Sequence, residues 1–134
     1  MPDARYQMPD VNMRLRIILL SLLVGVVGCS KETREILADL QTLSQDVAKE
    51  FGESQPNVNR TVDTITLTFI NPTFVSLDAT QKAAKAREIA TFAKTHYIGI
   101  DSCEKINIVV VKQKNYLVIK FGSSEPFRFE KDEL

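Results

Sequence analysis

The chain has 134 residues with 17 basic and 17 acidic side chains, so its formal net charge at pH 7 is zero. This length suits one ordinary domain, and a chain with no basic excess lacks the electrostatic footprint of a nucleic-acid-binding protein. The two cysteines, Cys29 and Cys103, form no Cys-x-x-Cys or Cys/His ligand pattern. Glycine-rich phosphate loops and nucleophile elbows are also missing from the sequence. We therefore expect a small domain with no cofactor, no metal site and no nucleic-acid partner.

The N-terminal part of the chain has the pattern of an export signal. Arg14 and Arg16 precede an apolar run over residues 17–27. A membrane-spanning helix needs about 20 apolar residues, so this run is too short to span a bilayer and fits the apolar region of a signal peptide. Residues 1–12 are polar and contain prolines, which is unusual ahead of such a signal. We expect the working start to be Met13.

The apolar run ends in Val26-Val27-Gly28-Cys29, which resembles the lipobox of bacterial lipoproteins. The resemblance implies that the sulfur of Cys29 accepts a diacylglyceryl group and that a peptidase cleaves between Gly28 and Cys29. It also implies that the new amino group is acylated. Two or three acyl chains anchor a protein stably, because each buried CH₂ contributes about 0.8 kcal/mol. The predicted organisation is a signal peptide over residues 1–28 and a periplasmic domain over residues 29–134.

Two further details concern where the protein resides. Ser30 stands where enteric-type lipoproteins retained at the inner membrane have aspartate, and this favours the outer membrane, facing the periplasm. The C-terminal Lys131-Asp132-Glu133-Leu134 spells an ER-retention signal, and Asn59-Arg60-Thr61 is a glycosylation sequon. An ER-lumen protein is therefore an alternative to the lipoprotein interpretation. The lipobox is favoured because it needs a more unusual combination of residues.

Apolar spacing predicts two helices, over residues 31–51 and from Asp78 to about Tyr97. Gly52 is a plausible stop for the first, and Asp78 with Gln81 resembles a capping box at the start of the second. One apolar face is expected on each helix: Ile36, Leu40, Leu43, Val47 and Phe51 with Leu37 alongside on the first, and Ala83, Ala86, Ala90, Ala93 and Tyr97 on the second.

The first strand is predicted over residues 61–71, after a loop over residues 53–60. Ile65, Leu67 and Phe69 alternate with threonines, so one face of the strand is apolar and the other is a threonine ladder. A threonine ladder can bind sugar, ice or an incoming strand. We favour the simpler interpretation that it is the wet face of an antiparallel sheet.

A β-hairpin is predicted from residues 105–111 and 116–121, joined by a turn over residues 112–115. The nearly continuous apolar run in its first strand suggests a central strand covered on both faces. Residues 122–126 are expected to turn the chain. Phe127 and Phe129 alternate with charged residues, which indicates a possible short last strand at the sheet edge, followed by a frayed tail.

These elements predict an α+β two-layer sandwich, with two helices on one face of a three- or four-stranded, mainly antiparallel sheet. The expected order is α-β-α-β-β, with the short last strand as an optional addition. The edge strand near Phe127 is a surface that a partner strand can join. The expected partners are the membrane, through the lipid anchor, and another envelope protein.

Chemistry-bearing residues are few. His96 lies close in sequence to Asp101, Cys103 and Glu104, which suggests a Cys-His-acid nucleophile site. Proximity in sequence is not triad geometry, and His96 also suits the last turn of a helix, where a cation is favourable. The preferred hypothesis is a lipid-anchored envelope lipoprotein with a non-catalytic binding or structural role. An enzyme with an unrecognised Cys/His site is the alternative.

Overall fold

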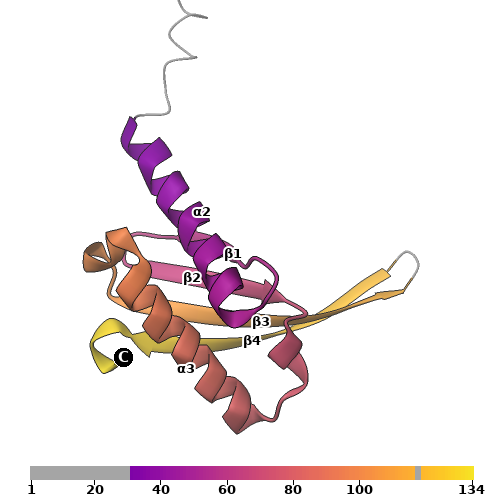
Figure 1. Ribbon diagram of the computed structural model, residues 1–134. Coiled ribbons are helices and arrows are strands. Elements are labelled where there is room, and N and C mark those ends of the chain that lie inside the picture. Colours follow the sequence, from indigo (N-terminus) through magenta and orange to yellow (C-terminus); the bar gives the residue numbers. More distant parts are fainter. Residues whose placement is uncertain (1–30, 117–118) are drawn as a thin grey trace, which may run out of the picture. The chain divides into compact units, whose positions relative to one another are not determined.

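The computed structural model describes residues 31–116 and 119–134 (Figure 1). The chain divides into two units, residues 1–34 and residues 35–134. The fold described below is that of residues 35–134, and its first helix, α2, begins a few residues earlier at Lys31. The predicted signal segment, with Gly28 and Cys29, lies outside the described residues. In chain order the helices and strands are α2 (Lys31–Phe51), β1 (Asn57–Arg60), β2 (Thr64–Ile70), α3 (Ala79–His96), β3 (Lys105–Tyr116) and β4 (Ile119–Glu130).

Both predicted helices form. The helix α2 has the predicted bounds, and Gly52 follows it with a φ of 65°, a left-handed conformation that glycine adopts at little cost. The side chain of Asp78 caps α3 by accepting a hydrogen bond of 2.9 Å from the backbone N–H of Gln81. Two residues were wrongly placed on the apolar faces: Leu37 is 58% exposed, and Ala83 is exposed as well. Among the described residues, no helix is both long and apolar enough to cross a membrane.

The sheet has four strands in the order β1-β2-β3-β4 and is mixed. Its outer pairings, β1 with β2 and β3 with β4, are antiparallel, but β2 and β3 run parallel. The prediction of a mainly antiparallel sheet missed this central pairing. The reason is the connection: β2 leads into α3, which carries the chain back before β3 begins, as a parallel neighbour requires.

The first strand, β1, was predicted to be a loop. Asn57 and Asn59 are exposed residues of a type that is common in loops, so the sequence does not indicate a strand here. Val58, between them, packs against the core. The strand is held in place from α2, because the hydroxyl of Ser44 donates a hydrogen bond of 2.7 Å to the carbonyl of Pro56. The observed order is therefore α-β-β-α-β-β.

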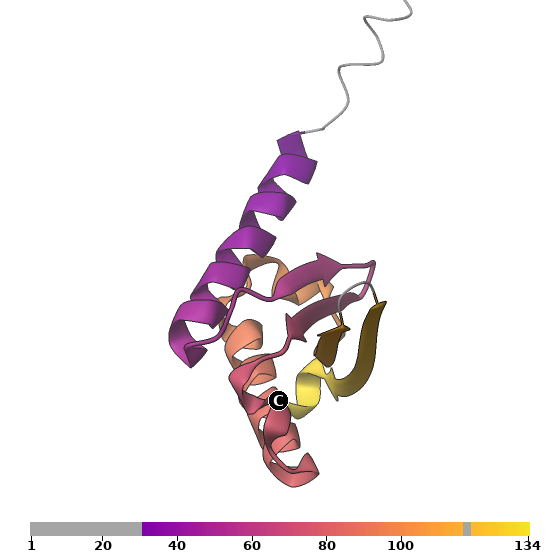
Figure 2. The ribbon, with the colours of Figure 1, turned by 90° about the vertical axis from the view of Figure 1, so that its right-hand side faces the viewer.

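The core lies between the helices and one face of the sheet (Figure 2). Alternate residues of the two central strands are almost completely buried there, while Leu43 and Val47 of α2 cover them from the helix layer. Alanines on α3 allow close packing, since their small side chains let the helix approach its neighbours. The buried strand residues are Ile65, Leu67 and Phe69 in β2 and Ile106, Ile108 and Val110 in β3.

The opposite face of the sheet is only half-buried. It carries the predicted threonine ladder, Thr64, Thr66 and Thr68, beside Asn107 and Val109 of β3. The expectation that β3 is covered on both faces is therefore wrong. Its outward-facing apolar residues, Val109 and Val111, are half-buried in a strand that lies between two others.

The last hairpin differs most from its prediction. The strands β3 and β4 pair over 12 residues each, from Lys105 opposite Glu130 to Tyr116 opposite Ile119. The expected turn at residues 112–115 is part of β3, and the expected turn at residues 122–126 is part of β4. Pro126 is compatible with β4 because that strand lies at the sheet edge, where one side of the backbone needs no ladder hydrogen bonds.

The C-terminal tail is docked, whereas the sequence suggested fraying. Residues Lys131–Glu133 form a 3₁₀ turn, and Leu134 packs against the core. From α3, Arg87 donates a hydrogen bond to the carbonyl of Glu133, and Lys94 donates one of 2.8 Å to the main-chain oxygen of Leu134.

Candidate functional site

The β3–β4 hairpin continues beyond the rest of the sheet (Figure 1). The pairing of β2 with β3 stops at Val111, so residues 112–116 and 119–123 form a strand ladder only with each other. We call these residues the arm. On the arm, Lys112 and Lys114 continue the side-chain alternation of Ile106, Ile108 and Val110, but no buried residue is described there.

Asn71 fixes the base of the arm. It lies directly after β2 with a φ of 48°, a conformation that asparagine tolerates better than most residues. Its side-chain amide donates to the carbonyl of Gln113 at 3.0 Å and accepts from the N–H of Gln113 at 2.7 Å. Its backbone N–H donates to the carbonyl of Val111 at 2.7 Å. The side-chain amide of Asn71 thus makes the two backbone hydrogen bonds that a further residue of β2 would make. It holds the backbone of Gln113, which lies between Lys112 and Lys114.

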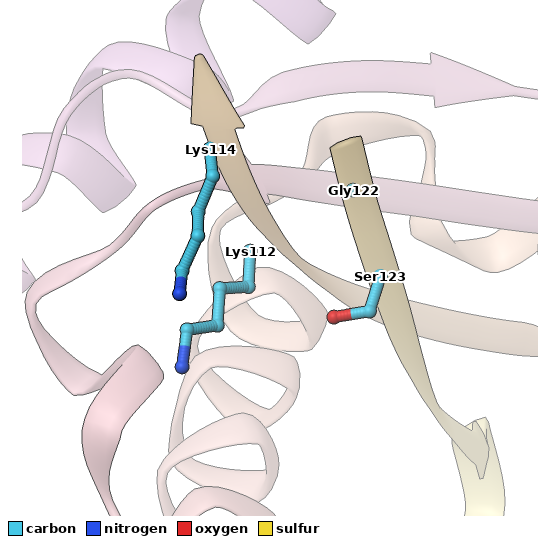
Figure 3. Close-up of a pocket in the computed structure, with 4 residues that line it drawn as sticks. All are labelled: Lys112, Lys114, Gly122 and Ser123. Carbon is cyan, nitrogen blue, oxygen red and sulfur yellow. The ribbon is translucent and has the colours of Figure 1, made fainter. Parts of the chain in front are cut away.

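A hollow of about 370 Å³ lies on the arm, and the described residues lining it are Lys112, Lys114, Gly122 and Ser123. We call this hollow the lysine groove. Figure 3 shows the two lysine side chains extending side by side from β3 and the hydroxyl of Ser123 pointing toward them from β4. A second hollow, of about 320 Å³, shares Lys112 and Ser123 with it and is also lined by Val75, Lys82, Val110, Ser124 and Glu125.

The charges around these two hollows are not balanced. Lys82 of α3 forms an ion pair with Glu125 of β4. Among the contacts of the described residues, the ammonium groups of Lys112 and Lys114 have neither an ion pair nor a hydrogen bond. Their cross-strand partners are Ser123 and Phe121, neither of which is acidic. The lysine groove therefore presents two uncompensated positive charges and a hydroxyl to solvent, an arrangement that suits an anion.

A second polar cluster surrounds the end of α3. The guanidinium of Arg60 donates to the hydroxyl of Tyr97 at 3.3 Å and to the hydroxyl of Ser102 at 2.7 Å. The hydroxyl of Ser102 in turn donates to the carbonyl of Gly99 at 2.8 Å. The hydrogen bond that Arg60 donates to Tyr97 is the main reason that the pKa of Arg60 is raised above its usual value. These contacts link β1 to the end of α3 and to the 3₁₀ turn that follows it.

Cys103 lies beside this cluster and is completely buried. Its thiol is 3.8 Å from the carbonyl of Gly99. Burial raises the pKa of the Cys103 thiol, and this outweighs the opposing attraction of the positive charges of Arg60 and Lys131. Because the thiolate is the nucleophilic form, burial and the raised pKa both disfavour nucleophilic attack by this thiol.

His96 has a different set of contacts. Its ring stacks on Phe92 with centroids 3.8 Å apart, and its Nδ1 lies 2.9 Å from the carbonyl of Phe92 and 2.8 Å from the hydroxyl of Thr95. These contacts are all within the last turn of α3, whereas the thiol of Cys103 contacts Gly99. The described contacts of His96 and Cys103 therefore share no partner.

The acidic members of the predicted trio, Asp101 and Glu104, have only main-chain hydrogen bonds among those described, so no described contact brings their carboxylates to His96 or Cys103. The carbonyl of Asp101 accepts from the ammonium of Lys131 at 3.4 Å, and the backbone N–H of Glu104 donates to the carbonyl of Asp63 at 2.7 Å. In the part of the chain that the structure describes, no three His, Cys, Asp or Glu side chains gather in a metal-binding arrangement.

Sequence reasoning missed the lysine groove because residues 112–115 were assigned to a turn. The signal was nevertheless present, since Lys112 and Lys114 extend the period-two pattern of the preceding strand. Compared with known proteins, the chain matches no family model, and no curated protein or solved structure is similar to it at a significant level.

Proposed function

We propose that this protein is a lipid-anchored lipoprotein of the bacterial cell envelope with a non-catalytic binding role. The observation that carries the proposal is the position of Cys29, which follows a basic and apolar segment and precedes α2 by a single residue, Ser30. The helix begins with charged, exposed residues, as expected for a chain that emerges into an aqueous compartment directly after its anchor. With so short a connection, the acylated cysteine keeps the start of α2 at the bilayer surface.

Two features favour binding over catalysis. The uncompensated lysines of the arm form an open surface for an anionic partner, whereas the one nucleophilic thiol of the folded domain is buried with a raised pKa. A nucleophilic cysteine needs the opposite environment, partly exposed and electropositive, with a neighbouring base. The alternative of an enzyme with a Cys/His site gains no support from the contacts of His96 and Cys103.

The ER-lumen alternative is disfavoured by the docked tail. A retention signal is read by a receptor, which needs access to the last residues. Here Arg87 and Lys94 hold the main-chain oxygens of Glu133 and Leu134 against α3. A receptor would have to displace these hydrogen bonds and the packing of Leu134 against the core.

Metabolic labelling with a palmitate analogue in a bacterial host tests the anchor. The wild-type chain and the Cys103→Ser variant should both incorporate the label, because Cys103 is buried in the folded domain. The Cys29→Ser variant should incorporate none and should leave the membrane fraction. Separation of the two membranes should place the labelled protein in the outer membrane. Labelling that persists in Cys29→Ser, or disappears only in Cys103→Ser, would contradict the proposal.

A further inference from the structure

We propose that the lysine groove binds a phosphate monoester, with Lys112 and Lys114 neutralising its charge and the hydroxyl of Ser123 donating a hydrogen bond to it. The proposal goes beyond the lipid anchor and does not depend on it. It is carried by a hollow of about 370 Å³ whose described lining combines two cationic side chains, one hydroxyl and a glycine. Figure 3 shows the two lysine side chains extending side by side, with the hydroxyl of Ser123 pointing toward them from β4.

The two lysines lie close enough for their positive charges to repel each other, and a bound anion would remove this repulsion. Residues two apart in a strand lie on the same face, about 6.6 Å apart along it, so the two ammonium groups repel each other. A carboxylate directly opposite would offset such a pair, but the residues opposite Lys112 and Lys114 are Ser123 and Phe121. An anion lying between the ammonium groups supplies the missing negative charge.

The number of charges favours a phosphate monoester over a carboxylate. A phosphate monoester carries a charge of about −1.5 to −2 at neutral pH, which matches two ammonium groups, and it has three oxygens that accept hydrogen bonds. A carboxylate carries a single charge and would leave one lysine uncompensated. The chain as a whole is formally neutral, so the positive character is local to the arm and gives no general attraction for polyanions.

The space available indicates a phosphate attached to a small polar group. The lysine groove, of about 370 Å³, is open to solvent and has more space than a bare phosphate fills. The adjoining hollow continues past Ser123 to Ser124 and Glu125, which present polar atoms, and to Val75. Because Lys82 and Glu125 neutralise each other in the lining of this hollow, it offers no further uncompensated charge for a second phosphate. A polyol or sugar carrying one phosphate fits both hollows.

Calorimetric titration of the full chain with glycerol 3-phosphate, in neutral detergent at fixed ionic strength, tests the proposal. The wild-type chain should show saturable binding to one site. The Lys112→Gln/Lys114→Gln variant should bind at least about tenfold more weakly, since it loses two charge-assisted hydrogen bonds. Ser123→Ala should weaken binding about threefold and serves as a second variant if the double variant folds poorly. Lys112, Lys114 and Ser123 are exposed, so normal folding is expected.

A charge-matched variant separates a site from general attraction. Lys49 in α2 and Lys105 at the start of β3 are exposed lysines outside the groove, and Lys49→Gln/Lys105→Gln removes the same net charge. Its affinity should stay within about twofold of wild type. Equal weakening in both double variants would overturn the proposal, because it would show non-specific attraction. Failure of the wild-type chain to bind either glycerol 3-phosphate or phosphatidic acid would overturn it as well.

The source of the phosphate is distinguished with two ligands that carry the same group. Glycerol 3-phosphate represents a soluble polyol phosphate, and phosphatidic acid in the same micelles represents a lipid headgroup. For each ligand, the difference in affinity between wild type and Lys112→Gln/Lys114→Gln gives the part of binding that depends on the groove. The ligand with the larger difference identifies the source, and two differences of about zero would refute the phosphate site.

Discussion

The two halves of the β3–β4 hairpin share one ladder and one side-chain alternation but serve different purposes. In the half that belongs to the sheet, the positions facing the helices are Ile106, Ile108 and Val110, all buried. In the arm, the next positions of the same series are Lys112 and Lys114, both exposed. The alternation continues across this boundary while the chemistry changes from apolar to cationic. Regular backbone structure therefore extends beyond the core, and the place where the apolar series ends marks where the core ends.

The comparison also separates stability from binding. A buried side chain in the sheet half contributes through the apolar surface it removes from water, at about 25 cal/mol per Å². An exposed lysine in the arm contributes almost nothing to folding and is free to interact with a ligand. Substitutions in the sheet half should therefore change the free energy of unfolding, and substitutions in the arm should change ligand affinity.

The largest effect is expected from truncating the core end of the hairpin. Ile108 is completely buried in the central strand, so Ile108→Ala should lower the free energy of unfolding by about 3 kcal/mol through lost burial and the remaining cavity. Lys114→Ala, in the same strand, should change it by less than about 0.5 kcal/mol. Urea unfolding of the full chain, followed by circular dichroism, measures both. Equal losses would show that the arm is part of the core.

A smaller effect is expected from two glycines that differ in the space around them. A Cβ added at Gly99 would lie 2.7 Å from the hydroxyl oxygen of Tyr97 and 2.8 Å from its ring, which is buried and held by Arg60. We expect Gly99→Ala to cost about 1–3 kcal/mol, because the ring has little room to move.

The matched substitution in the arm is Gly122→Ala. A Cβ there would meet its nearest neighbour, the carbonyl of Lys112, at 3.7 Å, an ordinary contact. Its effect should be within about 0.5 kcal/mol. The same unfolding measurement compares the two variants, and a loss for Gly122→Ala as large as that for Gly99→Ala would refute the distinction between a packed end and an open arm.

The sequence was sufficient to predict those helices and strands whose apolar residues recur with one clear period. Both helices and the strand with Ile65, Leu67 and Phe69 were predicted for this reason. The first strand was missed because two of its four residues are exposed asparagines, which are typical of loops. The parallel pairing of β2 and β3 depends on where the chain returns after α3, and local periodicity carries no information about this.

The candidate site was missed for a related reason. Gly122, Ser123, Ser124 and Pro126 are residues that usually mark turns, and here they form an edge strand opposite β3. Composition alone cannot distinguish a turn from a strand that has no core to cover. The groove depends on this pairing, because it is the register that places Ser123 beside Lys112. A correct register would have been needed before the two lysines could be interpreted as a site.

The last expected effect is on ligand affinity more than on stability, and it concerns the ion pair that borders the groove. Glu125 is half-exposed in its pair with Lys82, so Glu125→Gln should lower the free energy of unfolding by less than about 1 kcal/mol. The same change removes the one acidic side chain described in the lining of the two hollows. A single charge at about 7 Å in water is worth about 0.6 kcal/mol, which corresponds to a two- to threefold gain in affinity for glycerol 3-phosphate.

A second ion pair provides the control for this gain. Glu88 pairs with Lys85 on α3 at 3.0 Å and lines neither hollow, so Glu88→Gln removes the same charge from a comparable surface pair. Its effect on stability should be similarly small, but the affinity for glycerol 3-phosphate should not change. If Glu125→Gln weakens binding, Glu125 must orient the ligand or its neighbouring lysines. If Glu88→Gln strengthens binding equally, the gain comes from net charge, and the arm has no local preference for phosphate.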